Sequence, residues 1–181
     1  NIFDTFRAEP SYDNLIKAIK TRKGFLETIE VDPNYGKYHY DGHRNCNISM
    51  IPKDSLKHKN ICPVCKKPLT LGVLHRVEEL ADRPEGYVPK DVKSVVPFRK
   101  MVPLSEIIAY LHKAGIATKK IWAIYNKLIE LFGSELNILM DVEYSKLKAF
   151  DKKLADLIML NREGKLNVKA GYDGVYGKII D

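Results

Sequence analysis

Four side chains that can bind a soft metal lie in two close pairs between residues 43 and 65. Two residues separate His43 from Cys46, two separate Cys62 from Cys65, and 15 residues connect the pairs. Each pair predicts a tight turn that directs two side chains to one point, and the connecting segment brings the turns together. Three thiolates with one imidazole favour tetrahedral Zn²⁺. The spacing therefore predicts a zinc site formed by His43, Cys46, Cys62 and Cys65.

The fourth ligand is the least determined of the set. His43 fits the spacing best, and His39 and His75 are the alternatives. Four protein ligands leave the metal no open coordination position, so we expect this zinc to be structural rather than catalytic. A small segment with few large apolar side chains needs a structural metal ion of this kind to fold.

The sequence contains no common catalytic motif. It lacks a Gly-x-x-x-x-Gly-Lys-Ser/Thr loop, a Gly-x-Gly-x-x-Gly turn and a His-Glu-x-x-His pair. Glu78, Glu79 and Asp82 lie close together, but Arg76 and Arg83 accompany them, so we interpret them as a solvated face. We therefore predict no catalytic residue in this chain.

The net charge of +7 is unevenly distributed. Residues 37–76 carry eight Lys or Arg against two Asp, and residues 92–120 carry six against one Glu. Residues 1–36 and 121–163 each sum to −1. Two basic stretches on a nearly neutral background suggest an anionic partner, most commonly nucleic acid, with a solvated lysine-rich surface as the alternative.

The compartment follows from what the sequence lacks. No apolar run approaches the roughly 20 residues of a membrane-spanning helix. The N-terminus lacks signal-peptide features, and three cysteines cannot form a complete disulfide framework. We expect a cytoplasmic protein without a membrane partner. The first residue is not Met, which suggests a piece of a longer protein.

Three segments differ in pattern, and together they predict an α+β protein. Residues 1–32 predict a helix capped by Ser11 and a strand over 25–31, too little to bury a core alone. Residues 33–90 are rich in turn formers and contain every cysteine, which predicts a small zinc-ribbon-like module. Residues 91–181 are mainly helical, and we place the boundary before them in a polar, proline-containing connection.

The helical segment shows apolar residues at helical spacing over 104–111, 121–131 and 144–162. Thr118 can cap the second of these helices, the third is predicted to break near Asp151, and residues 137–140 could be extended. We interpret Trp122 as a core residue. Three glycines within residues 171–177 predict a turn or hairpin.

Several distinctive stretches carry a resemblance to a known family. They are Tyr38-His39-Tyr40-Asp41-Gly42-His43-Arg44-Asn45-Cys46, Cys62-Pro63-Val64-Cys65 and Leu69-Thr70-Leu71-Gly72-Val73-Leu74-His75-Arg76-Val77-Glu78-Glu79-Leu80-Ala81-Asp82-Arg83, with Asn1-Ile2-Phe3-Asp4, Pro103-Leu104-Ser105-Glu106-Ile107-Ile108 and Gly171-Tyr172-Asp173-Gly174-Val175-Tyr176-Gly177. The chain resembles, over essentially its whole length, endonuclease Q and its relatives, a group within the polymerase-and-histidinol-phosphatase (PHP) phosphoesterases.

The resemblance implies an architecture and an activity. Such proteins have an N-terminal barrel-like PHP domain with a metal-dependent phosphodiesterase centre, then a zinc module, then a helical domain. They cut DNA 5′ of deaminated bases such as uracil and hypoxanthine, and at abasic sites. The family's catalytic ligands, including an Asp-Ala-His segment, precede the point where this chain begins, and this sequence contains no Asp-Ala-His.

On this resemblance, residues 1–32 are the last helix and strand of a PHP barrel. Further divalent metals are expected only in that upstream domain, and the 181 residues are not expected to cleave DNA alone. The partner would be damaged duplex DNA. The alternatives are a non-catalytic zinc-ribbon module that binds nucleic acid or protein, and a purely architectural piece.

Lesion recognition requires extraction of a base, with basic and aromatic side chains holding the strand. The candidates for phosphate contacts, by charge and by position near the zinc knuckles, are Arg44, Lys66, Lys67, Arg76 and Arg83. Three tyrosines interleave with this basic stretch and could stack on bases, although we expect at least two to pack instead: Tyr35, Tyr38 and Tyr40.

Overall fold

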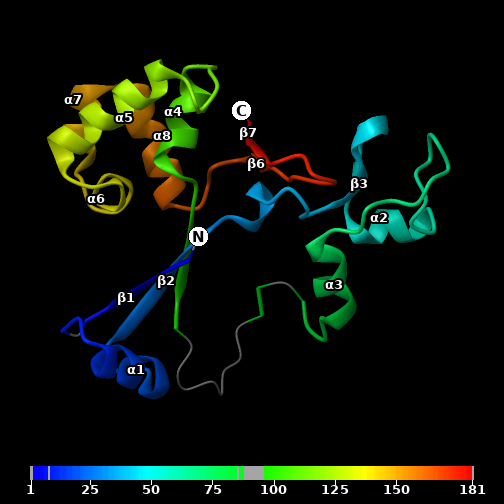
Figure 1. Cartoon of the computed structure of the whole chain (residues 1–181), viewed down its shortest axis with the longest axis horizontal. Coiled ribbons are helices and arrows are strands. Elements are labelled where there is room, and N and C mark those ends of the chain that lie inside the picture. The colour runs from blue at the N-terminus through cyan, green and yellow to red at the C-terminus, as the bar shows by residue number, and fades with distance from the viewer. Residues whose placement is uncertain (1, 8, 85, 88–95, 181) are drawn as a thin grey trace.

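The computed structural model describes residues 2–7, 9–84, 86–87 and 96–180. Helices of residues 104–162 gather on one side of the molecule, and the segment that holds the cysteines lies on the other (Figure 1). The C-terminal strands run between these two groups, and the N-terminal strands form a separate small sheet (Figure 1). The fold therefore mixes helices and strands, as the sequence predicts.

The N-terminal sheet has the order β1-β2-β5. Strand β1 (Ile2–Phe6) pairs antiparallel with β2 (Phe25–Val31), and β2 pairs parallel with β5 (Phe98–Met101). Helix α1 (Tyr12–Thr21) connects the first two strands, and the Ser11 hydroxyl accepts the Asn14 N–H at 3.3 Å. The predicted cap and the predicted strand over 25–31 are confirmed.

Five helices form the main hydrophobic core. They are α4 (Leu104–Leu111), α5 (Lys119–Phe132), α6 (Glu135–Met140), α7 (Tyr144–Phe150) and α8 (Lys152–Arg162). Many of the predicted apolar positions are fully buried, among them Leu104, Ile107, Ile121, Leu128 and Ile158. The predicted face over 121–131 is not buried to its end, because Leu131 is 55% exposed. The predicted break falls at Asp151, whose carboxylate accepts the Leu154 N–H at 3.0 Å and so begins α8.

The structure differs from the sequence predictions at three places in this region. Residues 137–140 are helical because the Ser134 hydroxyl caps α6 by accepting the Asn137 N–H at 3.2 Å. Thr118 occupies the N-cap position of α5, but its side chain makes no capping hydrogen bond. The prediction that Trp122 is a core residue is wrong, because 43% of this residue is exposed and its ring contacts Tyr125 edge-on.

The cysteine-containing segment has only short elements. They are the 3₁₀ turns η1 (Pro33–Tyr35) and η2 (Arg44–Cys46), strands β3 (Asp41–His43) and β4 (Ile48–Met50), and helices α2 (Pro52–Lys57) and α3 (Val73–Leu80). Strands β3 and β4 pair antiparallel. Such short elements bury little apolar surface, so other interactions must hold this segment.

The C-terminal tail returns to the cysteine-containing segment as a hairpin. Strand β6 (Val168–Lys169) pairs antiparallel with β7 (Lys178–Ile179), and Tyr172 forms a bridge with Val175. Asp173 and Gly174, with φ of 40° and 84°, make the tight turn between them. Positive φ at both central residues is the geometry of a type I′ hairpin turn. The predicted turn or hairpin over 171–177 is confirmed.

Parallel pairing of β2 with β5 joins the first predicted segment directly to the third. The predicted boundary near residue 90 lies outside the described residues. Among the helices that the structure describes, none has the length and apolar character needed to cross a bilayer.

Candidate metal centre

The first pair of ligands is positioned by β3 and η2. Strand β3 ends at His43, and the chain then turns through η2 to Cys46. Asn47 closes the turn in the left-handed region at φ 52°, and its N–H donates to the Arg44 carbonyl at 3.0 Å. Asn tolerates this conformation better than most residues. The turn therefore directs His43 and Cys46 to the same side.

The second pair lies in a tight knuckle. The Cys62 N–H donates to the Lys67 carbonyl at 2.8 Å, and the Lys66 N–H donates to the Cys62 carbonyl at 3.0 Å. Lys66 takes φ of 63°, which lets the chain reverse after Cys65. A bridge between Ile61 and Pro68 closes the loop.

The two turns bring the four predicted ligands together. One donor atom from each of His43, Cys46, Cys62 and Cys65 lies within 4.8 Å of the others, and His43 Nδ1 is 3.3 Å from Cys65 Sγ. Cys62 is buried and the other three are half-buried. This arrangement could hold a metal ion, and Nδ1 is the imidazole atom that faces the sulfurs. The structure thus brings together the four residues that the spacing predicts as metal ligands.

The two alternative histidines lie elsewhere. His75 is buried against Asp41, with its Nδ1 2.7 Å from the carboxylate. His39 stacks on Tyr40, with ring centroids 5.3 Å apart. The structure therefore places His43, and neither alternative, in the cluster.

The electrostatics of the cluster favour a bound cation. Burial alone raises the pKa of the Cys62 thiol, but the N–H groups of Cys65 and Val64 and the side chains of Cys65 and His43 outweigh it and lower the pKa to about 6. Burial, together with hydrogen bonding and like charge from Cys65 and Cys62, raises the pKa of Cys46 to about 11. A second thiolate is therefore costly beside the first unless a cation compensates it. Three sulfurs with one imidazole fit Zn²⁺.

A buried polar network supports the first knuckle. Asp41, in β3, is fully buried, and its carboxylate accepts the Gly72 N–H at 2.7 Å, the Ser55 hydroxyl and the His75 ring. These donors come from α2, from α3 and from the residue before α3. One carboxylate thus connects β3 to both helices. Sequence reasoning missed this network, because a lone Asp beside a Gly gives no signal that it is buried.

The C-terminal hairpin forms hydrogen bonds with the first turn and with Thr70. Asp173 accepts the Arg44 N–H and the Thr70 hydroxyl, both at 2.7 Å. The Tyr172 hydroxyl donates to the Asn47 side chain at 2.8 Å. The tail therefore contacts the first turn at Arg44 and Asn47, and also Thr70, which follows the second knuckle. These contacts join residues that are more than a hundred positions apart in the sequence.

Close backbone packing requires glycine at several places in this assembly, including Gly72 and Gly177. A Cβ at Gly72 would lie 2.3 Å from the His39 carbonyl oxygen, and a Cβ at Gly177 would lie 2.1 Å from the Asn34 carbonyl oxygen. Real Cβ atoms do not approach backbone so closely, so any side chain would separate these segments. This requirement accounts for glycine in both distinctive stretches.

All five candidates for phosphate contacts are exposed. Some already have partners: Arg76 pairs with Glu79 at 2.8 Å, Arg83 with Asp82 at 3.4 Å, and Lys66 donates to the Pro63 carbonyl at 2.9 Å. The acidic group of Glu78, Glu79 and Asp82 is exposed, as the solvated interpretation predicts.

The three interleaved tyrosines divide as expected. Tyr35 is half-buried, and its hydroxyl donates to Glu106 at 3.3 Å. Tyr40 is also half-buried and forms a bridge with Tyr172. Tyr38 is 46% exposed. Two tyrosines therefore pack, and one is available to a partner.

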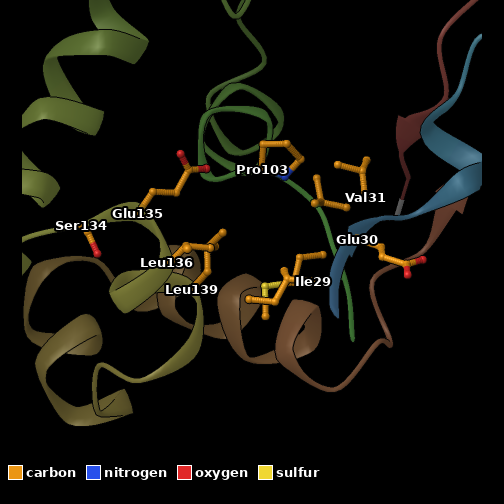
Figure 2. Close-up of a pocket in the computed structure, with 10 residues that line it drawn as sticks. Ile29, Glu30, Val31, Pro103, Ser134, Glu135, Leu136 and Leu139 are labelled. Carbon is orange, nitrogen blue, oxygen red and sulfur yellow. The ribbon is translucent and has the colours of Figure 1, made fainter. Parts of the chain in front are cut away.

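A cavity of about 370 Å³ lies apart from the metal cluster, between the N-terminal sheet and α6. Figure 2 shows apolar side chains of Ile29, Leu136 and Leu139 around it, while the Glu30 carboxylate points away. Glu135, which also lines it, accepts the Leu104 N–H and the Tyr125 hydroxyl, both at 2.8 Å. The cavity is therefore mainly apolar. Its Glu135 carboxylate already accepts two hydrogen bonds and, among the described residues that line the cavity, has no acid–base partner.

The chain is similar to several known sequences. The family described as the MJ0043 C-terminal domain matches residues 103–165. Uncharacterized protein MJ0043 of Methanocaldococcus jannaschii is 33% identical over 171 residues, which are 94% of this chain and 21% of that protein. Uncharacterized protein YqxK of Bacillus subtilis is 30% identical over 82% of this chain and 34% of that protein.

Solved structures extend the similarity to the fold. The lesion-specific endonuclease PfuEndoQ from Pyrococcus furiosus superposes with a TM-score of 0.84 at 30% identity, over 98% of this chain and 44% of that one. An endonuclease Q in complex with a 27-mer duplex substrate carrying an abasic lesion gives 0.83, also at 30% identity, over 98% of this chain and 45% of that one. The chain thus spans less than half the length of the relatives it matches.

Proposed function

We propose that this chain is the zinc-binding and DNA-binding portion of a DNA-repair endonuclease that cuts 5′ of deaminated bases, uracil and hypoxanthine, or at abasic sites. The observation that carries the proposal is the match of 98% of the chain to a lesion-specific endonuclease. A second solved structure of the same fold is an endonuclease Q in complex with a lesion-containing duplex. The metal cluster and the exposed cations around it fit a DNA-contacting role.

In this proposal the zinc builds the DNA surface rather than cutting DNA. His43, Cys46, Cys62 and Cys65 would fill all four positions of a tetrahedral ion, which leaves no position for a water nucleophile. The ion would fix the two knuckles relative to each other, and the Asp41 network and the tail would fix them relative to α2 and α3.

Catalysis would belong to an upstream PHP domain with its own divalent metals. We propose residues 1–32 as the end of that domain, residues 33–90 as the zinc module and residues 91–181 as a helical domain. The parallel β2–β5 pair, typical of α/β architectures, would also place Phe98–Met101 of the third segment in the same sheet as β2. We expect this repair protein to act in the cytoplasm.

The phosphate contacts would come from Arg44, Lys66, Lys67, Arg76 and Arg83. Arg44 and Lys67 are the stronger candidates, because Arg76 and Arg83 are already paired with carboxylates. The Arg44 guanidinium lies beside Gly174 at the tail turn, and its backbone is held by Asp173. An anchored backbone with an exposed cation suits a phosphate contact.

The test is a titration of the purified chain against matched duplexes with and without one deoxyuridine, at about 50 and 200 mM salt. Tighter, salt-sensitive binding to the uracil duplex is expected. Equal binding to both duplexes would assign lesion recognition to another part of the protein. Absence of binding at either salt concentration would refute the DNA-binding role and favour an architectural one.

A non-catalytic zinc-ribbon module that binds nucleic acid or protein is the second candidate. It is favoured because the segment similar to this chain occurs in proteins of different length, where it makes up 21% of one relative and 34% of another. A portable module of this kind would bind DNA without preference for a lesion, so the same titration separates the two functions.

A further inference from the structure

A groove with apolar, aromatic and basic side chains lies where the helical region meets the C-terminal tail. Its volume is about 760 Å³, and its polar residues are Tyr35, Glu106, Tyr110, Lys113, Tyr176 and Lys178. Volumes of roughly 300–1,000 Å³ are typical of sites for small molecules and cofactors. The groove is therefore large enough for an unstacked nucleotide, and it is distinct from the metal cluster.

Tyr176 presents its ring from a rigid backbone. The residue is 62% exposed, yet the next residue, Gly177, is packed against Asn34 and donates its N–H to the Tyr35 carbonyl at 3.1 Å. Two residues earlier, the Gly174 N–H donates to the Lys37 carbonyl at 2.8 Å. An exposed aromatic ring on a fixed backbone can stack on a partner at small cost in conformational entropy.

A second exposed ring and a cation adjoin Tyr176. The Lys37 ammonium lies 5.7 Å from the centroid of the Tyr176 ring and 5.6 Å from that of Tyr38, which is 46% exposed. The ammonium contacts two π-faces, and among the residues that the structure describes it forms no ion pair with a carboxylate, so it can still pair with a phosphate.

The charges of the groove favour an anion. Lys113 and Lys178 line the groove and are exposed. Lys37 is not a lining residue, but its contact with the Tyr176 ring brings a third cation next to the groove. The groove's acidic side chain, Glu106, accepts the Tyr35 hydroxyl at 3.3 Å. Lys37 belongs to the first basic stretch of the sequence and Lys113 to the second, so Tyr176 lies where the fold brings the two stretches together.

We propose that this groove binds unstacked nucleotides of single-stranded or locally opened DNA, with Tyr176 as a base-stacking residue and Lys37, Lys113 and Lys178 as phosphate contacts. Aromatic platforms beside cations are the usual means of holding single strands, because every base has a π-face. In an intact duplex those faces are covered, whereas extraction of a damaged base uncovers them. The proposal rests on the DNA-binding function proposed above and adds to it a strand-holding site.

The test compares Tyr176→Ala with Tyr176→Phe in the 181-residue chain, using a labelled oligothymidylate and an undamaged duplex. Loss of one base–aromatic stack weakens binding by about 5- to 150-fold. Tyr176→Ala is expected to lose that much affinity for the single strand and little for the duplex, and Tyr176→Phe to bind like the wild type. Because the ring is largely exposed, both variants should keep their fold and their zinc content.

A charge variant provides an independent readout. Lys113→Gln should reduce the salt dependence of single-strand binding by about 0.7 in log–log slope, the value for one phosphate contact. Wild-type binding by Tyr176→Ala, or equal losses in the Ala and Phe variants, would overturn the groove proposal. The lesion preference of the wild-type chain is a separate test, of the proposed function. A ring-dependent single-strand affinity without a lesion preference would support the groove and refute lesion reading.

Discussion

Replacement of Asp41 by Asn should loosen the metal-binding module from within. The buried carboxylate accepts hydrogen bonds from Gly72, Ser55 and His75. In Asp41→Asn, Oδ1 can still accept the Gly72 N–H, but an NH₂ group would face the other two donors. The side chain keeps its shape, so the change removes acceptor capacity rather than volume.

The size of the effect follows from the bonds that are lost. Hydrogen bonds to a charged group contribute about 1.5–3 kcal/mol each, and two of them are disrupted. The Ser55 hydroxyl also lies 3.0 Å from the Pro52 carbonyl oxygen, to which it can turn, so the lower end of the sum applies. We expect the free energy of local opening to fall by about 3 kcal/mol.

Amide hydrogen exchange measures this opening directly. The Gly72 N–H is donated to Asp41, so its protection reports whether the module is closed. A loss of about 3 kcal/mol corresponds to roughly a hundredfold faster exchange, since each 1.4 kcal/mol is a factor of about ten. Ser55→Ala, which removes one donor, should give an intermediate effect.

Asp54→Asn is the matched control. Asp54, in α2, pairs with Lys57 at 2.7 Å on the surface, where water screens the interaction. Asp54→Asn should therefore leave the exchange rate of the Gly72 N–H unchanged. A change of less than about tenfold for Asp41→Asn, that is less than about 1.4 kcal/mol, or an equal change in the control, would refute the role assigned to the Asp41 network.

Three further changes have defined outcomes. Because the pKa of Cys46 is raised to about 11, this thiol is protonated at neutral pH and must lose its proton to bind metal. Zinc binding should therefore release protons, and affinity should rise with pH, most steeply below the Cys62 pKa of about 6, where the Cys62 proton is displaced as well. Calorimetry in buffers of different ionisation enthalpy counts these protons. Lys67→Gln should lower duplex affinity and reduce its log–log salt slope by about 0.9. Asn161→Leu would leave the buried N–H and C=O of Val102 without the side chain that now pairs both, lowering the free energy of unfolding by about 1–3 kcal/mol for each group and with it the thermal midpoint.

Each of these changes has an outcome that would contradict it. Equal binding enthalpies in all buffers would mean that no thiol proton is released. Lys153→Gln in α8 and Asn126→Leu in α5 are exposed controls for the two substitutions. If Lys67→Gln and Lys153→Gln have the same duplex affinity and salt slope, Lys67 is not a phosphate contact. If Asn161→Leu and Asn126→Leu have the same thermal midpoint, the Asn161 side chain does not stabilise the core.

The sequence predicts the metal centre well because its ligands lie in two local turns. Two residues between ligands determine a knuckle whatever the rest of the chain does, so Cys46, Cys62 and Cys65 could be named in advance. Spacing also favoured His43 over His39 and His75, but only the folded chain separates the three histidines. The helices from α4 to α8 were predictable for a similar reason, since apolar spacing and caps such as Asp151 are local. What failed locally was Trp122, because a large aromatic side chain does not reveal whether its helix face is covered.

The remainder depends on contacts between distant segments. Strand β5 pairs in parallel with β2 across about seventy residues of sequence, and a single sequence carries no signal for that register. The Asp41 network and the tail contacts of Asp173 are non-local in the same way. Tyr176 lies between the two basic stretches only because the hairpin folds back onto them. Counting charges along the sequence therefore could not show that the two stretches meet.

The proposed function depends on four side chains holding one zinc ion that organises the DNA surface. X-ray absorption at the zinc edge of the purified chain tests this most directly, because it gives both the metal and its ligands. We predict one zinc per chain with three sulfurs at about 2.3 Å and one nitrogen at about 2.0–2.1 Å. A chain that carries no zinc, or a zinc shell without that three-sulfur, one-nitrogen set, would contradict it.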